Sequence, residues 1–229
     1  DGSNEETSRF LVAFSQQTDA ELIHNPTAKG YTFAANQGLC ATTSPYICLL
    51  NSDTIVSSHW LAKMLACLKS DQRIGIVGPL SNFASWQSLP IKNHSDIDVN
   101  HVAAIVEDHS PRLYPKRSVL NGFCFLMKRE VLEQVGLFDE IYFGAGYGEE
   151  DDYCIRARQL GWALCVADNT YVHHFKSKSY SSDRRQLLVK KATESLINKY
   201  GQKVIQEHIR EAQYDIVLKK SINILMKKL

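Results

Sequence analysis

Two polar clusters in this sequence interrupt apolar segments, and both have residue types that could do chemistry. Asn51, Ser52 and Asp53 directly follow the apolar run "YICLL". Four consecutive carboxylates, Glu149 to Asp152, stand in "GYGEEDDYCIRAR". Neighbouring carboxylates raise one another's pKa, and a helix N-terminus by itself calls for only one or two of them. The acidic run is therefore predicted to contain a proton-transferring group.

Asp53 stands where a strand is predicted to end. In open α/β sheets, ligands bind at the carboxyl ends of the strands, so a residue in this position faces a cleft. The alternative is a simple turn in which Asp53 caps the following helix. The residues around Asp53 leave both interpretations open.

Helical spacing divides the acidic run. Glu149 and Asp152 share one side of a helix, and Arg156 lies one turn beyond Asp152, whereas Glu150 points to another face. We therefore expect Arg156 to hold Asp152 and Glu150 to be free to accept a proton. A slip of one residue at the helix start would give that role to Asp151.

Strand and helix patterns alternate around these clusters. Strands are predicted at 21–25, 46–50 and 74–79, a strand followed by a helix within 118–140, and a strand or extended segment at 163–175. Further helices are predicted within 8–17, from Tyr31 and within 57–71. Segment 81–115 is predicted to be an insertion with one helix near 99–108. This order predicts an α/β fold with a mostly parallel sheet flanked by helices.

Composition excludes several classes of protein. The 229 residues are 44% hydrophobic and 22% charged, as in an ordinary globular chain. Six cysteines without a CxxC pair are more typical of buried thiols in a cytoplasmic protein than of a disulfide framework or zinc site. No apolar run approaches the roughly 18 to 20 residues of a membrane span, and the N-terminus lacks a signal-peptide pattern.

Positive charge is concentrated at the C-terminus. From Arg184 onward there are eleven Lys or Arg against four Asp or Glu, although the whole chain has a net charge of only +1. We therefore divide the chain into residues 1–182 and a basic helical extension, 183–229. In "VLKKSINILMKKL", lysines alternate with aliphatic residues, which predicts an amphipathic helix facing a partner domain or anionic membrane rather than nucleic acid. A solvated terminal helix is the alternative.

Five motifs in order carry a family resemblance: "NPTAKGYTFAANQGL", "YICLLNSDTIV", "NGFCFLMKREVLEQVGLFDE", "GYGEEDDYCIRARQLGW" and "YVHHFKSKSY". Together they resemble a family 2 glycosyltransferase with the GT-A fold, a Rossmann-like sheet. Such enzymes transfer a sugar from a nucleotide-diphosphate donor to an acceptor hydroxyl with inversion. The family opens with a strand, a helix and a strand ending in "DDGS", so this chain, starting at "DGS", is expected to be N-terminally truncated.

The resemblance implies roles for individual residues. Asp53, the last residue of a DxD-like motif whose first position is Asn51, would bind Mg²⁺ or Mn²⁺ with His174. Glu150 would be the general base, with Asp151 as the alternative. The expected donor-binding residues are Asp1, Lys29, Asn36, Asn51, Ser52, Asp53, Asn121, Gly122, Lys178 and Ser179. The expected acceptor-binding residues are Trp86, Glu149 and Asp152.

The resemblance also implies substrates: a UDP- or dTDP-sugar donor and a glycan or lipid-linked acceptor in surface polysaccharide synthesis. A second hypothesis is a degenerate GT-A domain that binds a carbohydrate or protein partner without turnover. Asn51 and the missing first segment favour that hypothesis. Asp53, the acidic run and His174 oppose it.

Overall fold

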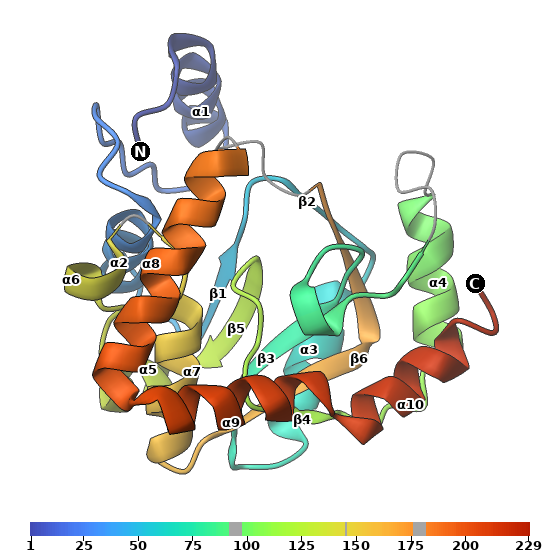
Figure 1. Cartoon of the computed structure of the whole chain (residues 1–229). Helices are drawn as coiled ribbons and strands as arrows, with labels where there is room; N and C mark the ends of the chain where they lie inside the picture. Colours follow the sequence, from blue (N-terminus) through green and yellow to red (C-terminus); the bar gives the residue numbers. More distant parts are fainter. Residues whose placement is uncertain (92–97, 145, 176–181) are drawn as a thin grey trace.

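A six-stranded sheet forms the centre of the chain in the computed structural model, which describes residues 1–91, 98–144, 146–175 and 182–229 (Figure 1). The strand order is β1-β5-β3-β6-β2, with β4 paired to β6. The strands are β1 (Tyr46–Leu50), β2 (Thr54–Val56), β3 (Ile74–Leu80), β4 (Lys116–Arg117), β5 (Cys124–Lys128) and β6 (Ala163–His174).

The sheet is mixed, which corrects the prediction of a mostly parallel sheet. Among the described strands only β3 and β6 pair in parallel, because β5 runs antiparallel between β1 and β3, and β2 and β4 run antiparallel to β6. The strand predicted at 21–25 does not form. β1, β3 and β6 nevertheless share one direction, so their carboxyl ends meet at the same edge of the sheet.

Helices cover both faces of this sheet. They are α1 (Glu5–Gln17), α2 (Tyr31–Ala41), α3 (Trp60–Lys69), α4 (Val99–His109), α5 (Arg129–Val135), α6 (Glu140–Phe143), α7 (Glu149–Gln159), α8 (Ser182–Tyr200), α9 (Gln202–Gln213) and α10 (Ile216–Leu225), with a short 3₁₀ turn, η1 (Ser85–Gln87).

Successive side chains of a strand pack into two different hydrophobic clusters. Phe125 of β5 packs in one cluster with residues of α2, α4, α5, α7 and α10, whereas its neighbour Leu126 packs in the other with α3. Successive side chains of a strand point to opposite faces, so the same short strands supply both layers. The predicted α/β class is confirmed by this arrangement.

The C-terminal helices are part of the folded body. Leu218 and Leu225 of α10 are 2% and 0% exposed and belong to the main core, and α9 and α10 run along the lower edge of the view in Figure 1. These two residues of α10 are therefore covered within the chain, whereas Ile216 at its start is 81% exposed. The contact of this helix with a membrane or a partner domain stays a prediction.

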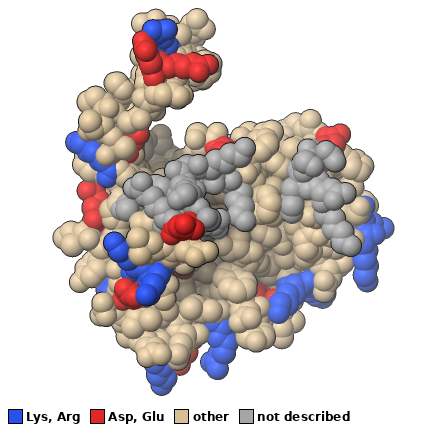
Figure 2. All heavy atoms as spheres, turned by 45° about the horizontal axis from the view of Figure 1, so that its top comes forward, with Lys and Arg blue, Asp and Glu red and all other residues tan. Residues whose placement is uncertain are grey.

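Basic side chains do not merge into a single patch on the face seen in Figure 2. There the Lys and Arg residues of the described part lie apart around the rim, and α1 projects from the body. All six cysteines are free, and four of them are buried. Within the described ranges, no helix combines the length and the apolar character that crossing a membrane requires.

Candidate active site

Asp53 and His174 meet at the carboxyl-end edge of the sheet. Strand β2 begins directly after Asp53 and pairs with the end of β6, where Thr54 lies opposite His174. The Phe175 N–H donates to the Asp53 carbonyl oxygen at 2.9 Å. As a result, Asp53 Oδ1 lies 3.3 Å from His174 Nε2. The helix-cap alternative for Asp53 is wrong, because a strand follows it and α3 begins only at Trp60.

Three residues fix the position of His174. Its Nδ1 lies 2.8 Å from the carbonyl oxygen of Phe83, and the Phe123 ring stacks on it at a centroid distance of 4.9 Å. Asn82 bonds both backbone groups of His174, at 2.8 and 3.0 Å. Since a carbonyl only accepts, Nδ1 carries the hydrogen, and in the neutral ring Nε2 is then the acceptor that faces Asp53.

The donor set of this pair fits a divalent cation. His174 Nε2 and Asp53 Oδ2 are buried atoms with no hydrogen-bond partner among the described residues, and Asp53 Oδ1 lies beside Nε2. Buried polar atoms are costly when unsatisfied, and a cation held by the carboxylate and the neutral imidazole would satisfy them. The described residues contain no cluster of three or more metal-binding side chains, so Mg²⁺ or Mn²⁺ here would also need phosphate or water oxygens.

Glu150 lines a pocket of about 120 Å³ at the start of α7. Trp86, Asn121 and Asp151 line the same pocket, and Glu150 Oε2 is buried with no hydrogen-bond partner in the described part of the chain. Helix α7 starts after Gly148, whose φ of 90° lies in the left-handed region that glycine accepts readily. The pocket thus places the Glu150 carboxylate, which has one unpartnered oxygen among the described residues, beside the exposed ring of Trp86.

The proton affinities in the acidic run are perturbed by burial. Burial, followed by the charge of Asp151, raises the pKa of Glu150 from 4.5 to about 7. Burial, followed by the charge of Glu150, raises the pKa of Glu149 well above its usual value. A carboxylate whose pKa lies near neutrality is matched to general-base catalysis at physiological pH.

Residues 121–123 lie between the Glu150 pocket and the Asp53–His174 pair. Asn121 lines the Glu150 pocket, and Phe123 stacks on His174. Between them, a Cβ built on Gly122 would lie 3.5 Å from Glu150 Cβ. The structure therefore brings Asp53, His174, Glu150 and Asn121-Gly122 near one another at this edge of the sheet, while their functional roles stay predictions.

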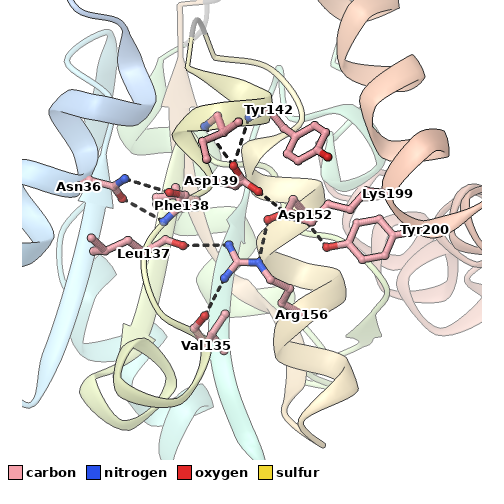
Figure 3. A network of polar contacts seen from close by, with 11 residues as sticks. Asn36, Val135, Leu137, Phe138, Asp139, Tyr142, Asp152, Arg156, Lys199 and Tyr200 are labelled. Atoms are coloured by element: carbon pink, nitrogen blue, oxygen red, sulfur yellow. Dashed lines mark hydrogen bonds and ion pairs between the residues drawn. The ribbon is translucent and has the colours of Figure 1, made fainter.

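Asp152 lies in a different environment, and its prediction as an acceptor-binding residue is wrong. Its side chain is 0% exposed, and both oxygens are engaged (Figure 3). Oδ2 accepts from Arg156 Nε at 2.8 Å, while Oδ1 is 2.6 Å from the Tyr200 hydroxyl and 2.7 Å from Lys199 Nζ. No surface remains for an acceptor, but the predicted contact with Arg156 is confirmed.

The Asp152 network extends to three other segments. Arg156 donates to the carbonyl oxygens of Val135 and Leu137 at 2.7 and 3.0 Å, and Lys199 also pairs with Asp139 at 2.7 Å. Figure 3 shows these partners converging on α7 from the α5–α6 connection and from α8. Asp152 therefore links the acidic helix start to the C-terminal helices.

Asn36 is also structural, which corrects its prediction as a donor-binding residue. Its amide nitrogen donates to the Phe138 carbonyl and to Glu140 Oε1 at 3.0 and 2.7 Å, and its oxygen accepts from Phe138 N–H at 3.0 Å. It is buried, and it joins α2 to the start of α6 (Figure 3). Glu149 is 6% exposed as well, whereas Trp86 is 45% exposed and remains the accessible acceptor-site prediction.

Asp1 and Lys29 lie together at the loop before α2. The Asp1 carboxylate accepts from the backbone N–H groups of Lys29 and Gly30 at 3.0 Å and so organises the loop before α2. Lys29 Nζ lies 4.4 Å from the centroid of the Phe33 ring. Their donor-binding roles stay predictions.

The remaining predicted donor-binding residues lie either near segment 121–123 or outside the described part of the chain. The Asn51 N–H donates to the Phe123 carbonyl at 2.8 Å, which sets Asn51 and the exposed Ser52 beside the 121–123 segment. The Asn121 N–H donates to Gln87 Oε1 at 2.9 Å. Lys178 and Ser179 lie outside the described residues.

Sequence reasoning missed Asn82, Gln87 and His208. Asn82 follows β3 just as Asp53 follows β1, so its position after a buried strand was a usable signal. Gln87 and His208 act through contacts with residues 34 or more positions away, and no local pattern marks such pairs.

Comparison with known proteins agrees with this geometry. The sequence model described as glycosyl transferase family 2 matches residues 1–136. The pre-mycofactocin glycosyltransferase of Mycobacterium tuberculosis is 27% identical over 163 residues, which are 68% of this chain and 32% of the relative. The chain thus spans about a third of the length of that relative.

Solved structures show the same fold. A mannosyltransferase from Pyrobaculum calidifontis, in complex with GDP-Man and Mn²⁺, superposes with a TM-score of 0.61 at 14% identity, covering 98% of this chain and 61% of the other. Glucosyl-3-phosphoglycerate synthase from Mycobacterium tuberculosis, with Mg²⁺ and UDP, gives 0.53 at 17% identity, covering 87% and 66%.

The mixed sheet, its flanking helices and the polar edge define a GT-A glycosyltransferase fold. The family model covers more than half of the chain, and the chain belongs to glycosyl transferase family 2.

Proposed function

We propose that this chain transfers a sugar from a nucleotide-diphosphate donor, a UDP- or dTDP-sugar, to an acceptor hydroxyl with inversion. The observation that carries the proposal is Glu150, whose Oε2 is buried and unpartnered among the described residues, in a pocket that also holds the exposed Trp86. Its connection to Asp53 and His174 through residues 121–123 supports placing donor and acceptor at adjoining positions.

Glu150 acts as the general base. It takes the proton of the acceptor hydroxyl while the acceptor oxygen forms its bond to the anomeric carbon. The bond from that carbon to the diphosphate oxygen breaks, and the nucleoside diphosphate leaves with the electron pair. Attack on the face opposite the leaving group inverts the anomeric centre. Asp151, in the same pocket, is the alternative base.

Asp53 and His174 would hold Mg²⁺ or Mn²⁺. The cation supplies charge neutralisation for the leaving diphosphate. The chain's own contribution is to orient the two ligands: Phe83 fixes the tautomer of His174, and Asn82 and Phe123 fix its position. Asn51 and Ser52 flank the same position and are proposed to contact the donor.

The acceptor is proposed to be a glycan or lipid-linked sugar of a surface polysaccharide. The exposed ring of Trp86 beside Glu150 supports a sugar acceptor, because aromatic faces pack well on the C–H surfaces of sugars. Six free cysteines support a cytoplasmic location for this reaction.

Titration calorimetry of UDP with and without Mn²⁺, followed by a screen of nucleotide sugars for donor hydrolysis and transfer, tests the proposal. We expect UDP binding that depends on Mn²⁺ and turnover with at least one donor. Metal-dependent binding of UDP without hydrolysis or transfer of any donor would contradict an enzymatic role.

A degenerate binding domain is the second candidate, favoured by the amide of Asn51 where the motif usually has a carboxylate. It predicts UDP binding that is absent or independent of the metal. Calorimetry together with the donor-hydrolysis screen therefore separates the two candidates before any acceptor is known.

A further inference from the structure

His208 is a buried side chain that the proposed chemistry does not use. It belongs to α9, is 6% exposed, and has no hydrogen-bond partner at either ring nitrogen among the described residues. Its Nε2 lies 3.5 Å from Asp151 Oδ1, and its backbone carbonyl accepts from the Ser118 hydroxyl at 3.1 Å. A buried imidazole without partners is costly, so this approach to a carboxylate requires an explanation.

The neighbouring charges are already paired. Arg158 of α7 bonds Glu211 of α9 at 2.8 Å, and Arg117 bonds Asp215 at 2.7 Å. Asp151 therefore remains the carboxylate within reach of the His208 ring in the described part of the chain. The Asp151 side chain, 35% exposed, borders the pocket that holds Glu150.

We propose that His208 is a positioning residue that draws the Asp151 carboxylate towards α9 and leaves Glu150 as the carboxylate that accepts the proton. The inference rests on the proposed function. It extends that function to a helix beyond residues 1–136, which the family model matches. It also favours Glu150 over Asp151 as the base, because Asp151 Oδ1 lies 3.5 Å from His208 Nε2, while Glu150 Oε2 has no partner within the described ranges.

His208→Leu and His208→Gln form the test pair. Leucine removes the polar contact, whereas glutamine keeps an N–H that can reach Asp151. In the full chain with Mn²⁺ and an active donor, we expect His208→Leu to lower kcat by about 3- to 30-fold with an unchanged KM for the donor. His208→Gln should recover most of the loss. Equal kcat for the leucine variant and the parent would overturn the proposal.

Ile205→Val is the matched control for packing. Ile205 is a buried residue of the same helix that packs in a cluster with Phe143, Ile155 and Leu196 rather than against the acidic run. It should lose some stability, as Ile-to-Val changes in cores generally do, with kcat unchanged. A control variant that lowers kcat as much as His208→Leu would attribute the effect to α9 packing and contradict a positioning role.

A double-mutant cycle of His208→Leu and Asp151→Asn, measured by urea unfolding, needs no activity. We expect a coupling of about 2- to 10-fold in the unfolding equilibrium constant. Additive effects would overturn the contact and with it the proposal. Absence of turnover in the parent would instead overturn the proposed function, while the cycle still reports whether the two side chains interact.

Discussion

Asp152 and Glu150 stand two residues apart in one helical turn and have opposite surroundings. Asp152 has a charged or hydroxyl partner for each oxygen, drawn from its own helix and from α8. Glu150 lines a pocket, its Oε2 is buried without a partner among the residues described, and its pKa is raised to about 7. A fully satisfied buried carboxylate stabilises the fold, and an unsatisfied one is the kind of group that chemistry uses.

Glu150→Gln tests the reactive side of the comparison and has the largest expected effect. The amide keeps the shape but cannot take a proton, so transfer should fall by about 10²- to 10⁴-fold. Calorimetry should show unchanged affinity for UDP and Mn²⁺, which separates chemistry from binding. If transfer survives in this variant and is lost in Asp151→Asn, the base is Asp151.

Asp152→Asn tests the structural side. It leaves Lys199 and Arg156 facing a neutral amide in a buried site, so the free energy of unfolding should fall by about 3 kcal/mol. Urea titration measures this change. Transfer per folded molecule should stay within a few-fold of the parent, and a loss of chemistry equal to that of Glu150→Gln would remove the distinction between the two carboxylates.

Asp53→Asn extends the comparison to another carboxylate with a buried oxygen that lacks a partner among the described residues. Removal of its charge should lower the Mn²⁺-dependent affinity for UDP by about 10- to 100-fold while the fold is kept. Calorimetry with and without Mn²⁺ gives the difference. Ser58→Ala, an exposed change outside the predicted donor-binding residues, is the control and should bind UDP as the parent does. The idea fails if the Asp53→Asn variant binds UDP in Mn²⁺ as tightly as the parent.

The smallest expected effect is on the pH dependence of stability. A pKa of Glu150 raised from 4.5 to about 7 means that the folded state binds more protons in this range, so the free energy of unfolding falls as pH rises from 4.5 to 7. We expect a fall on the order of 2 kcal/mol, weaker in Glu150→Gln. Urea titrations at pH 5 and 8 measure it, and Glu194→Gln, an exposed change, should behave as the parent.

The sequence predicted much of the site because its signals are local. Asp53 follows an apolar strand, and the spacing of Asp152 and Arg156 places them one helical turn apart. It predicted the α/β class from alternating patterns for the same reason. The local sequence could not show that β5 runs antiparallel or that no strand forms at 21–25. Strand pairing depends on which distant strand lies alongside.

The sequence by itself determined which residue types are available: strand-end carboxylates, an acidic helix start and the motifs of one family. Only the tertiary structure decided their roles. The acidic run is contacted from helices about 50 residues further along the chain, by Lys199, Tyr200 and His208. Asn36 forms its hydrogen bonds with Phe138, about 100 residues away. Burial and partners set the proton affinity and availability of a carboxylate, and both come from contacts between distant segments that no local spacing encodes.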